Sequence, residues 1–211
     1  MMRHAFDRAM CEHYRAHGGR ALRQLATRWW EEDAFKVRRL IIRDALEDHL
    51  AGRYRVSIPT LLPCLEGVVA DTFALGANSR VTDGLDSIAS DLVQGFDALE
   101  VEVALAALSA LYGSVDFSTT SPFSPRLNRH LILHGRTVRY GTEANSLKVI
   151  LHLDQIRSQI ATKRVLEADQ EMPLEARPIR VANALVRQLG VPNDVIIAAR
   201  ELHAARAQRV S

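Results

Sequence analysis

The sequence is poor in cysteine and contains no long uncharged run of apolar residues. Its two cysteines, Cys11 and Cys64, are too few for a disulfide scaffold and fit a protein of a reducing compartment. The longest uncharged apolar run, residues 103–113, is too short to cross a bilayer, which takes about 20 residues. The first residues also lack the apolar segment of a secretory signal peptide, so we expect a cytoplasmic protein with no membrane association.

The sequence also lacks any long alternation of apolar and polar residues and any internal repeat. Apolar residues instead recur at three- and four-residue spacing along nearly the whole chain. With 47% hydrophobic and 25% charged residues, the 211 positions have the composition of a globular protein with a real core. The sequence therefore predicts an all-α fold, an antiparallel bundle of about four to six helices.

Three apolar stripes in the first third of the chain predict helices that each turn one face toward the core. We expect Gly52 to end the second helix and Pro59 to be the first residue of the third. Cys64 falls within the third stripe and is a predicted core residue. The stripes are Leu22, Leu25 and Trp29; Val37, Leu40, Ile41 and Ala45; and Ile58, Leu61, Leu62, Leu65, Val68, Val69 and Phe73.

Helical spacing continues to the end of the chain. Further helices are expected after an N-cap at Asp83, over 142–166, and near 179–189 and 193–209. The two tail helices resemble a DNA-binding helix-turn-helix, but the second is alanine-rich and offers few side chains that could read bases. The predicted organisation is N-terminal helices over 1–52, a helical core over 53–170, and a C-terminal helical appendage over 171–211.

Charge is segregated along the chain, although the net charge is only +2. Residues 81–125 hold seven acidic groups and no Lys or Arg, whereas residues 117–142 hold four arginines and no Asp or Glu. One interpretation is that exposed helix faces happen to differ in sign. The other is a basic patch that binds an anionic ligand, with the acidic helices facing elsewhere or meeting a partner.

The most informative segment is LNRHLILHG, which concentrates Arg129, His130 and His134 within nine residues. We expect a short helix here that begins near Ser124, as an N-cap before a proline, and ends at Gly135. Histidine changes charge near neutral pH, and arginine presents a planar fork of donors that matches phosphate oxygens.

These side chains suit transesterification of RNA, in which a 2′-hydroxyl attacks the adjacent phosphorus. His134 would move the proton, Arg129 would offset charge on the phosphoryl oxygens, and His130 would support them. No metal and no other cofactor is required by that scheme. Further substrate contacts are expected from the neighbouring arginines Arg126, Arg136 and Arg139.

Helix geometry restricts this scheme. Arg129 and His134 are five residues apart, about 140° round an ideal helix and about 7.5 Å along it. They would not point the same way from one straight helix, whereas His130 and His134 share a face. Either the helix distorts near Gly135, or a second copy of the helix faces the first, as a symmetric homodimer would provide.

The order of Arg129, a polar His130 and His134 resembles the R-x4-6-H pattern of the HEPN superfamily, a set of α-helical proteins. The segments NRHLILHG, YGTEANSLK and IPTLLPCLEGVVAD also resemble a group of bacterial proteins that share N-R-H-x-I/L-L-H-G and Y-G-T-x-x-N-S-L. The likeness covers roughly residues 50–160.

The resemblance implies an HEPN-like helical bundle that acts as a metal-independent endoribonuclease in toxin–antitoxin or anti-phage defence systems. It implies catalytic roles for Arg129 and His134 with His130 in support. It further implies a homodimer in which the two motifs meet across the interface, an RNA substrate, and a neutralising protein partner.

Two other interpretations remain open for these residues. HEPN-like domains without catalysis serve as binding or scaffolding modules, and here Arg129 would only pin the bundle while His134 caps a helix end. Glu66 lies on the otherwise apolar third helix beside Gly67, where we expect another part of the protein to approach closely. It is a secondary site candidate or the partner of a buried arginine.

A metal site on His130-x3-His134 is the third interpretation, because that spacing places two imidazoles on one helical face. Its third ligand would come from His152, Asp154 or Glu66, since no HExxH glutamate is present. The remaining histidines (His4, His13, His17, His49 and His203) lie among charged residues and are expected to face solvent. Tyr140 is expected to order the following loop, with Thr142 and Asn145 capping the next helix.

Overall fold

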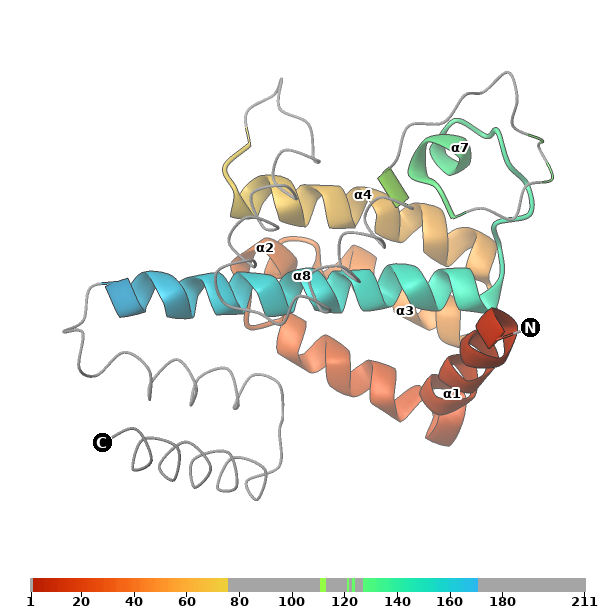
Figure 1. Ribbon diagram of the computed structural model, residues 1–211, viewed down its shortest axis with the longest axis horizontal. Coiled ribbons are helices and arrows are strands. Elements are labelled where there is room, and N and C mark those ends of the chain that lie inside the picture. Colours follow the sequence, from red (N-terminus) through yellow and green to blue (C-terminus); the bar gives the residue numbers. More distant parts are fainter. Residues whose placement is uncertain (1, 76–110, 113–120, 122, 124–126, 171–211) are drawn as a thin grey trace, which may run out of the picture. The chain divides into compact units, whose positions relative to one another are not determined.

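The computed structural model describes residues 2–75, 111–112, 121, 123 and 127–170 (Figure 1). Every regular element within these ranges is a helix, so the predicted all-α class is confirmed for this part of the chain. The chain divides into two compact units, residues 1–157 and 158–211. The helices expected after Asp83 and in the tail lie outside the described residues. No helix among the described residues is both long enough and apolar enough to cross a membrane.

Six helices make up the described residues, and five of them lie wholly within the first unit. Helix α3 packs along α4, and α4 also contacts α2 and α7. Figure 1 shows α4 passing from its contact with α2 towards α7. The helices are α1 (Met2–Trp29), α2 (Asp33–Lys36), α3 (Arg39–Leu50), α4 (Tyr54–Thr72), α7 (Arg129–Leu133) and α8 (Glu143–Gln170).

Helix α1 is broken in its middle into two arms that run in different directions (Figure 1). His17, Gly18 and Gly19 have φ angles of 53°, 65° and 77°, in the left-handed region that favours glycine. Gly19 is required for a second reason, because a Cβ atom there would collide with the side chain of Leu50. The break therefore lets α1 pass close to the end of α3.

The predicted apolar stripe at the start of α3 is wrong by its register. Val37, Leu40 and Ile41 are 80%, 64% and 52% exposed. Val37 is the C-cap of α2, so the stripe combined residues of two separate elements. Because α3 begins only at Arg39, its buried face is the set Ile42, Ala45, Leu46 and His49.

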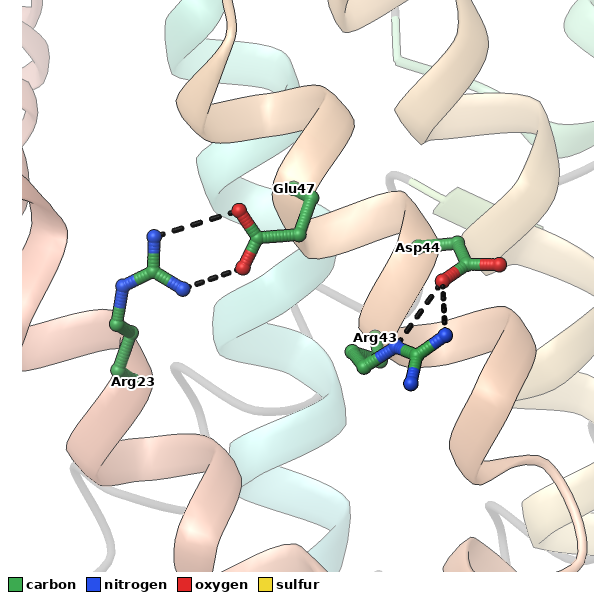
Figure 2. Close-up of polar contacts among 4 residues, drawn as sticks. All are labelled: Arg23, Arg43, Asp44 and Glu47. Atoms are coloured by element: carbon green, nitrogen blue, oxygen red, sulfur yellow. Dashed lines mark hydrogen bonds and ion pairs between the residues drawn. The ribbon is translucent and has the colours of Figure 1, made fainter.

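Two arginine–carboxylate contacts lie on the outside of α3 (Figure 2). Arg23 of α1 donates from both terminal nitrogens to the two carboxylate oxygens of Glu47, one of them at 3.3 Å. Arg43 donates to its neighbour Asp44 at 2.9 and 3.1 Å. Each pair is exposed to solvent, so neither is expected to contribute more than about 1 kcal/mol to folding.

Helix α4 begins at Tyr54, so the expectation that Pro59 is its first residue is wrong. Pro59 lies inside the helix and has no N–H to give to the carbonyl of Arg55, four residues earlier. The hydroxyl of Tyr140 donates to that carbonyl at 3.3 Å instead. A side chain 85 positions along the chain thus satisfies the group that proline leaves open.

Buried apolar side chains from α1, α3, α4 and α8 make up most of the core of the described residues. Trp29 is fully buried, as predicted for a packing residue, and lies against Phe35 with ring centroids 5.9 Å apart. Its indole N–H donates to Asp154 of α8 at 2.8 Å. Cys64 is also buried, in agreement with its predicted place in the core.

Candidate functional site

Helix α7 carries the histidine–arginine segment and starts later than predicted. Its N-cap is Asn128, which has an extended backbone and whose side-chain oxygen accepts the N–H of Leu131 at 3.2 Å. The expected cap, Ser124, lies outside the described residues and four positions too early. Asparagine is as good an N-cap residue as serine.

Gly135 ends α7 as predicted. Its φ of 65° is left-handed. Its N–H donates to the carbonyl of Ile132 at 3.1 Å, and the N–H of Arg136 donates to Leu131 at 2.7 Å. This pair of bonds is a Schellman motif, which satisfies the last carbonyls of a helix. His134 is the C-cap, so its position is fixed by backbone hydrogen bonds on both sides.

The two histidines of α7 lie beside each other. The ring planes of His130 and His134 are parallel to within 1°, with centroids 6.0 Å apart. The predicted shared face is thereby confirmed. His130 is half-buried, whereas His134 is exposed at the end of the helix. The arrangement offers two imidazoles to one surface ligand.

Arg129 does not join the two histidines in the described contacts. As the first residue of α7 it reaches α4, where Nε and Nη2 each donate to one carboxylate oxygen of Glu66, the latter at 2.9 Å. The side chains are 28% and 18% exposed, so the pair is only partly screened by water. The sequence-based alternative that Glu66 pairs with an arginine is confirmed.

Gly67, next to Glu66, lies where another part of the protein approaches closely, as predicted. The guanidinium of Arg38 occupies the space that a Cβ atom at this position would need. Arg38 is held there by the carbonyl of Ala34 at 2.8 Å and the carboxylate of Asp71 at 2.6 Å. Arg38 therefore packs against the turn of α4 that carries Glu66.

The remaining predicted contact residues lie on the surface after α7. Arg136 and Arg139 are exposed, and the guanidinium of Arg139 lies over the ring of Phe123 at 5.3 Å. Arg126 lies outside the described residues. The surface carries exposed apolar side chains as well, namely Leu133, Val138 and Phe123.

The loop from α7 to α8 is ordered by Tyr140 and Thr142. The Thr142 hydroxyl caps α8 by accepting the N–H of Asn145 at 3.2 Å, as expected. Asn145 also contacts the loop before α8. Its side-chain amide donates to the carbonyl of Tyr140 at 2.9 Å and holds the loop backbone. With the Tyr140–Arg55 bond, these contacts fix the path of the chain that leaves the histidine pair.

The metal interpretation finds no third ligand in the part of the chain that the structure describes. No group of three or more His, Cys, Asp or Glu side chains there could hold an ion. Glu66 is engaged by Arg129, and Asp154 accepts from Trp29 and Arg28. The two candidate carboxylates are therefore held in other contacts.

Sequence reasoning missed a polar cluster in the core. His49, expected to face solvent, is buried, and its Nδ1 lies 2.8 Å from the hydroxyl of Ser146. That hydroxyl is 3.1 Å from the hydroxyl of Ser57, also fully buried. Burial lowers the pKa of His49, the carboxylate of Glu143 opposes this effect, and the guanidinium of Arg15 adds to it. The missed signal was that His49 is three residues after Leu46, on the true buried face of α3.

Tyr112 was also missed. Its hydroxyl is buried and has no hydrogen-bond partner among the described residues. Burial raises the pKa of Tyr112, the charge of Glu66 raises it further, and that of Arg129 lowers it. The phenol thus lies within electrostatic reach of the Arg129–Glu66 pair. The sequence contained no signal for this, since Tyr112 only ends an apolar run.

Comparison of the chain with known protein families, curated proteins and solved structures finds no match.

Proposed function

We propose that the chain is an HEPN-like, metal-independent endoribonuclease that cleaves RNA by attack of a 2′-hydroxyl on the adjacent phosphorus. His134 and His130 carry the proton transfers, and Arg129 contacts the phosphodiester. Arg136 and Arg139 contribute positive charge along the RNA backbone, in the manner of other nucleic-acid interfaces.

The observation that supports this proposal best is the parallel pair formed by the half-buried His130 and by His134 at the exposed end of α7. Two imidazoles on one face provide a base and an acid at neutral pH. A purely capping His134 would need no second ring parallel to it. The exposed arginines that follow make the same surface attractive to a polyanion.

In the proposed reaction the neutral imidazole of His134 takes the proton of the 2′-hydroxyl as the oxygen attacks phosphorus. The bond from phosphorus to the 5′-oxygen breaks, and the imidazolium of His130 gives that oxygen a proton. The products are a 2′,3′-cyclic phosphate and a free 5′-hydroxyl. Arg129 offsets the charge that develops on the phosphoryl oxygens.

A second copy of the chain is part of the proposal. Arg129 reaches Glu66 of α4, whereas the rings of His130 and His134 lie parallel to each other along α7, so one copy does not aim all three at one phosphate. A symmetric partner could present its own α7 opposite the first. Leu133 and Val138, exposed beside the histidines, would be covered in such a dimer.

The test is cleavage of a mixed-sequence RNA by purified protein in EDTA, with analysis of the product ends. We expect cleavage that leaves 2′,3′-cyclic phosphate and that disappears in His134→Ala. His13→Ala removes an exposed histidine from α1 and serves as the matched control. Equal cleavage by the His134 variant and the parent would overturn the proposal.

The Arg129–Glu66 pair favours one alternative, a catalytically inactive HEPN-like interaction or RNA-binding module. In that case Arg129 holds α7 on α4 and is not offered to a substrate. Such a module would bind RNA or a protein without cleaving it. Retained RNA binding with intact RNA after long incubation would support this function over the nuclease.

A further inference from the structure

Arg129 is occupied in this structure by Glu66, and this has a consequence that rests on the proposed function. The carboxylate uses both of its oxygens on the guanidinium fork. A phosphodiester would need the same donors, because arginine binds carboxylate and phosphate through the same planar geometry. Substrate and Glu66 therefore compete for one group.

The hydroxyl of Tyr112 is the second observation. It is buried without a hydrogen-bond partner among the described residues, which is costly for a phenol. The charges of Glu66 and Arg129 both act on the pKa of this phenol. A carboxylate that leaves Arg129 needs a new donor, and a phenol O–H is a suitable one.

We propose that Arg129, Glu66 and Tyr112 form an exchange site for an RNA phosphodiester. The phosphodiester displaces the Glu66 carboxylate from the guanidinium, and the carboxylate then accepts a hydrogen bond from the Tyr112 hydroxyl. Glu66 and Tyr112 are thus positioning residues that set how readily Arg129 accepts RNA. In the exchange the Arg129 guanidinium replaces its two bonds to Glu66 with bonds to the phosphodiester, and Glu66 gains the Tyr112 hydroxyl as a donor, so this partly buried ion pair can open.

The experiment is binding of a fluorescent 2′-O-methyl oligoribonucleotide in EDTA, read by anisotropy. This probe binds as RNA but has no 2′-hydroxyl to attack, so binding is measured apart from cleavage. Glu66→Gln is expected to tighten binding about tenfold, the size expected for removing one charge-assisted competitor. Glu47→Gln is the matched control, because Glu47 forms the same two-point contact with Arg23 on an exposed surface (Figure 2). It removes the same charge and should leave the affinity unchanged.

Tyr112→Phe provides the second arm. It should weaken binding severalfold in the parent and not at all in the Glu66→Gln background, where no carboxylate needs a donor. Thermal unfolding should show no loss of stability in Tyr112→Phe, since a hydroxyl without a partner is removed. A phenol with a merely structural role would lower stability and weaken binding equally in both backgrounds.

Three outcomes overturn the inference: no binding of the oligonucleotide by any variant, unchanged or weaker binding by Glu66→Gln, and equal tightening by Glu47→Gln. The proposed nuclease activity is judged separately. If the parent cleaves RNA but Glu66→Gln binds the oligonucleotide with unchanged affinity, the exchange site is wrong and the nuclease proposal stands. The expected binding pattern without cleavage removes catalysis alone.

Discussion

Two histidine regions of the molecule differ in almost every physical respect. His49 is buried between α3, α4 and α8, with its ring nitrogen on the hydroxyl of Ser146. His134 stands exposed at the end of α7, parallel to His130. A buried imidazole with a lowered pKa serves packing and stays neutral. An exposed imidazole near arginines can meet an anion and exchange a proton with it. Burial therefore separates a histidine that supports the fold from one available for chemistry.

The largest effect is expected when the exposed histidine, His134, is removed. His134→Ala should lower RNA cleavage by about 10²–10⁴-fold, the usual contribution of a general acid–base group. Its free energy of unfolding should change by less than about 0.5 kcal/mol, as for other surface positions. Product formation and chemical denaturation of the same preparation measure both quantities. A loss of stability that matches the loss of cleavage would show that His134 is structural.

Removal of the buried member should give the reverse result. His49→Ala leaves a cavity and takes the partner from Ser146, so unfolding should become easier by about 2–4 kcal/mol. Cleavage per folded molecule should stay at the parent value. Urea titration gives the first number, and activity at a temperature where the variant is folded gives the second. Unaltered stability would contradict the buried cluster.

The pH dependence of the free energy of unfolding reports on the buried histidine. The folded state holds the pKa of His49 below its ordinary 6.5, so it resists protonation more than the unfolded chain does. Stability is then fully present above about 6.5 and falls as the pH drops below it, by at most about 1.4 kcal/mol per pH unit for one group.

His152, whose pKa is lowered by burial as well, should add to the same fall. Denaturation midpoints between pH 7 and 5 measure the slope. His49→Asn keeps a polar group near Ser146 but does not titrate, so its slope should be shallower than that of the parent. His13→Asn should leave the slope unchanged, because that side chain is exposed. An identical slope in the His49 variant would assign the effect elsewhere.

The smallest effect is expected in the turn that follows the exposed His134. Gly135→Ala introduces a Cβ with nothing within 4 Å, so its cost comes from the positive φ alone and should be about 1 kcal/mol. The hydrogen bonds of the Schellman motif that place His134 would be strained. The rate of cleavage should therefore fall by more than the loss of free energy of unfolding alone would explain. Parallel assays of rate and unfolding compare the two. Cleavage equal to that of the parent would show that the position of His134 does not depend on this turn.

Several features of the fold and of the candidate site could be predicted from local sequence rules. Gly135 ends α7 because few other residues adopt its φ. Gly67 next to a lone carboxylate correctly indicated a close contact and an arginine partner for Glu66. The shared face of His130 and His134 follows from helical spacing alone.

The errors came from features that depend on distant residues. Proline has no N–H for a helical hydrogen bond, so Pro59 is predicted at the start of a helix. In the folded chain the Tyr140 hydroxyl donates to the carbonyl of Arg55 in place of that N–H, and this contact cannot be read from the local sequence. The stripe that starts at Val37 crossed from α2 into α3, and this misplaced the buried face and hid His49. Tyr112 has no local signal, because its neighbours are known only after folding.

Helix α4 contains two interior prolines, Pro59 and Pro63, and the first of them links α4 to a distant segment. In the interior of a regular helix each carbonyl accepts the N–H of the residue four positions later. Pro59 opens a single acceptor at Arg55, and the loop that follows the histidines is moored to it through Tyr140. The defect in one helix thus becomes an anchor point for another segment. Replacing Pro59 with a better helix former would provide an N–H for the carbonyl of Arg55. The loop would then lose the acceptor through which Tyr140 holds it to α4.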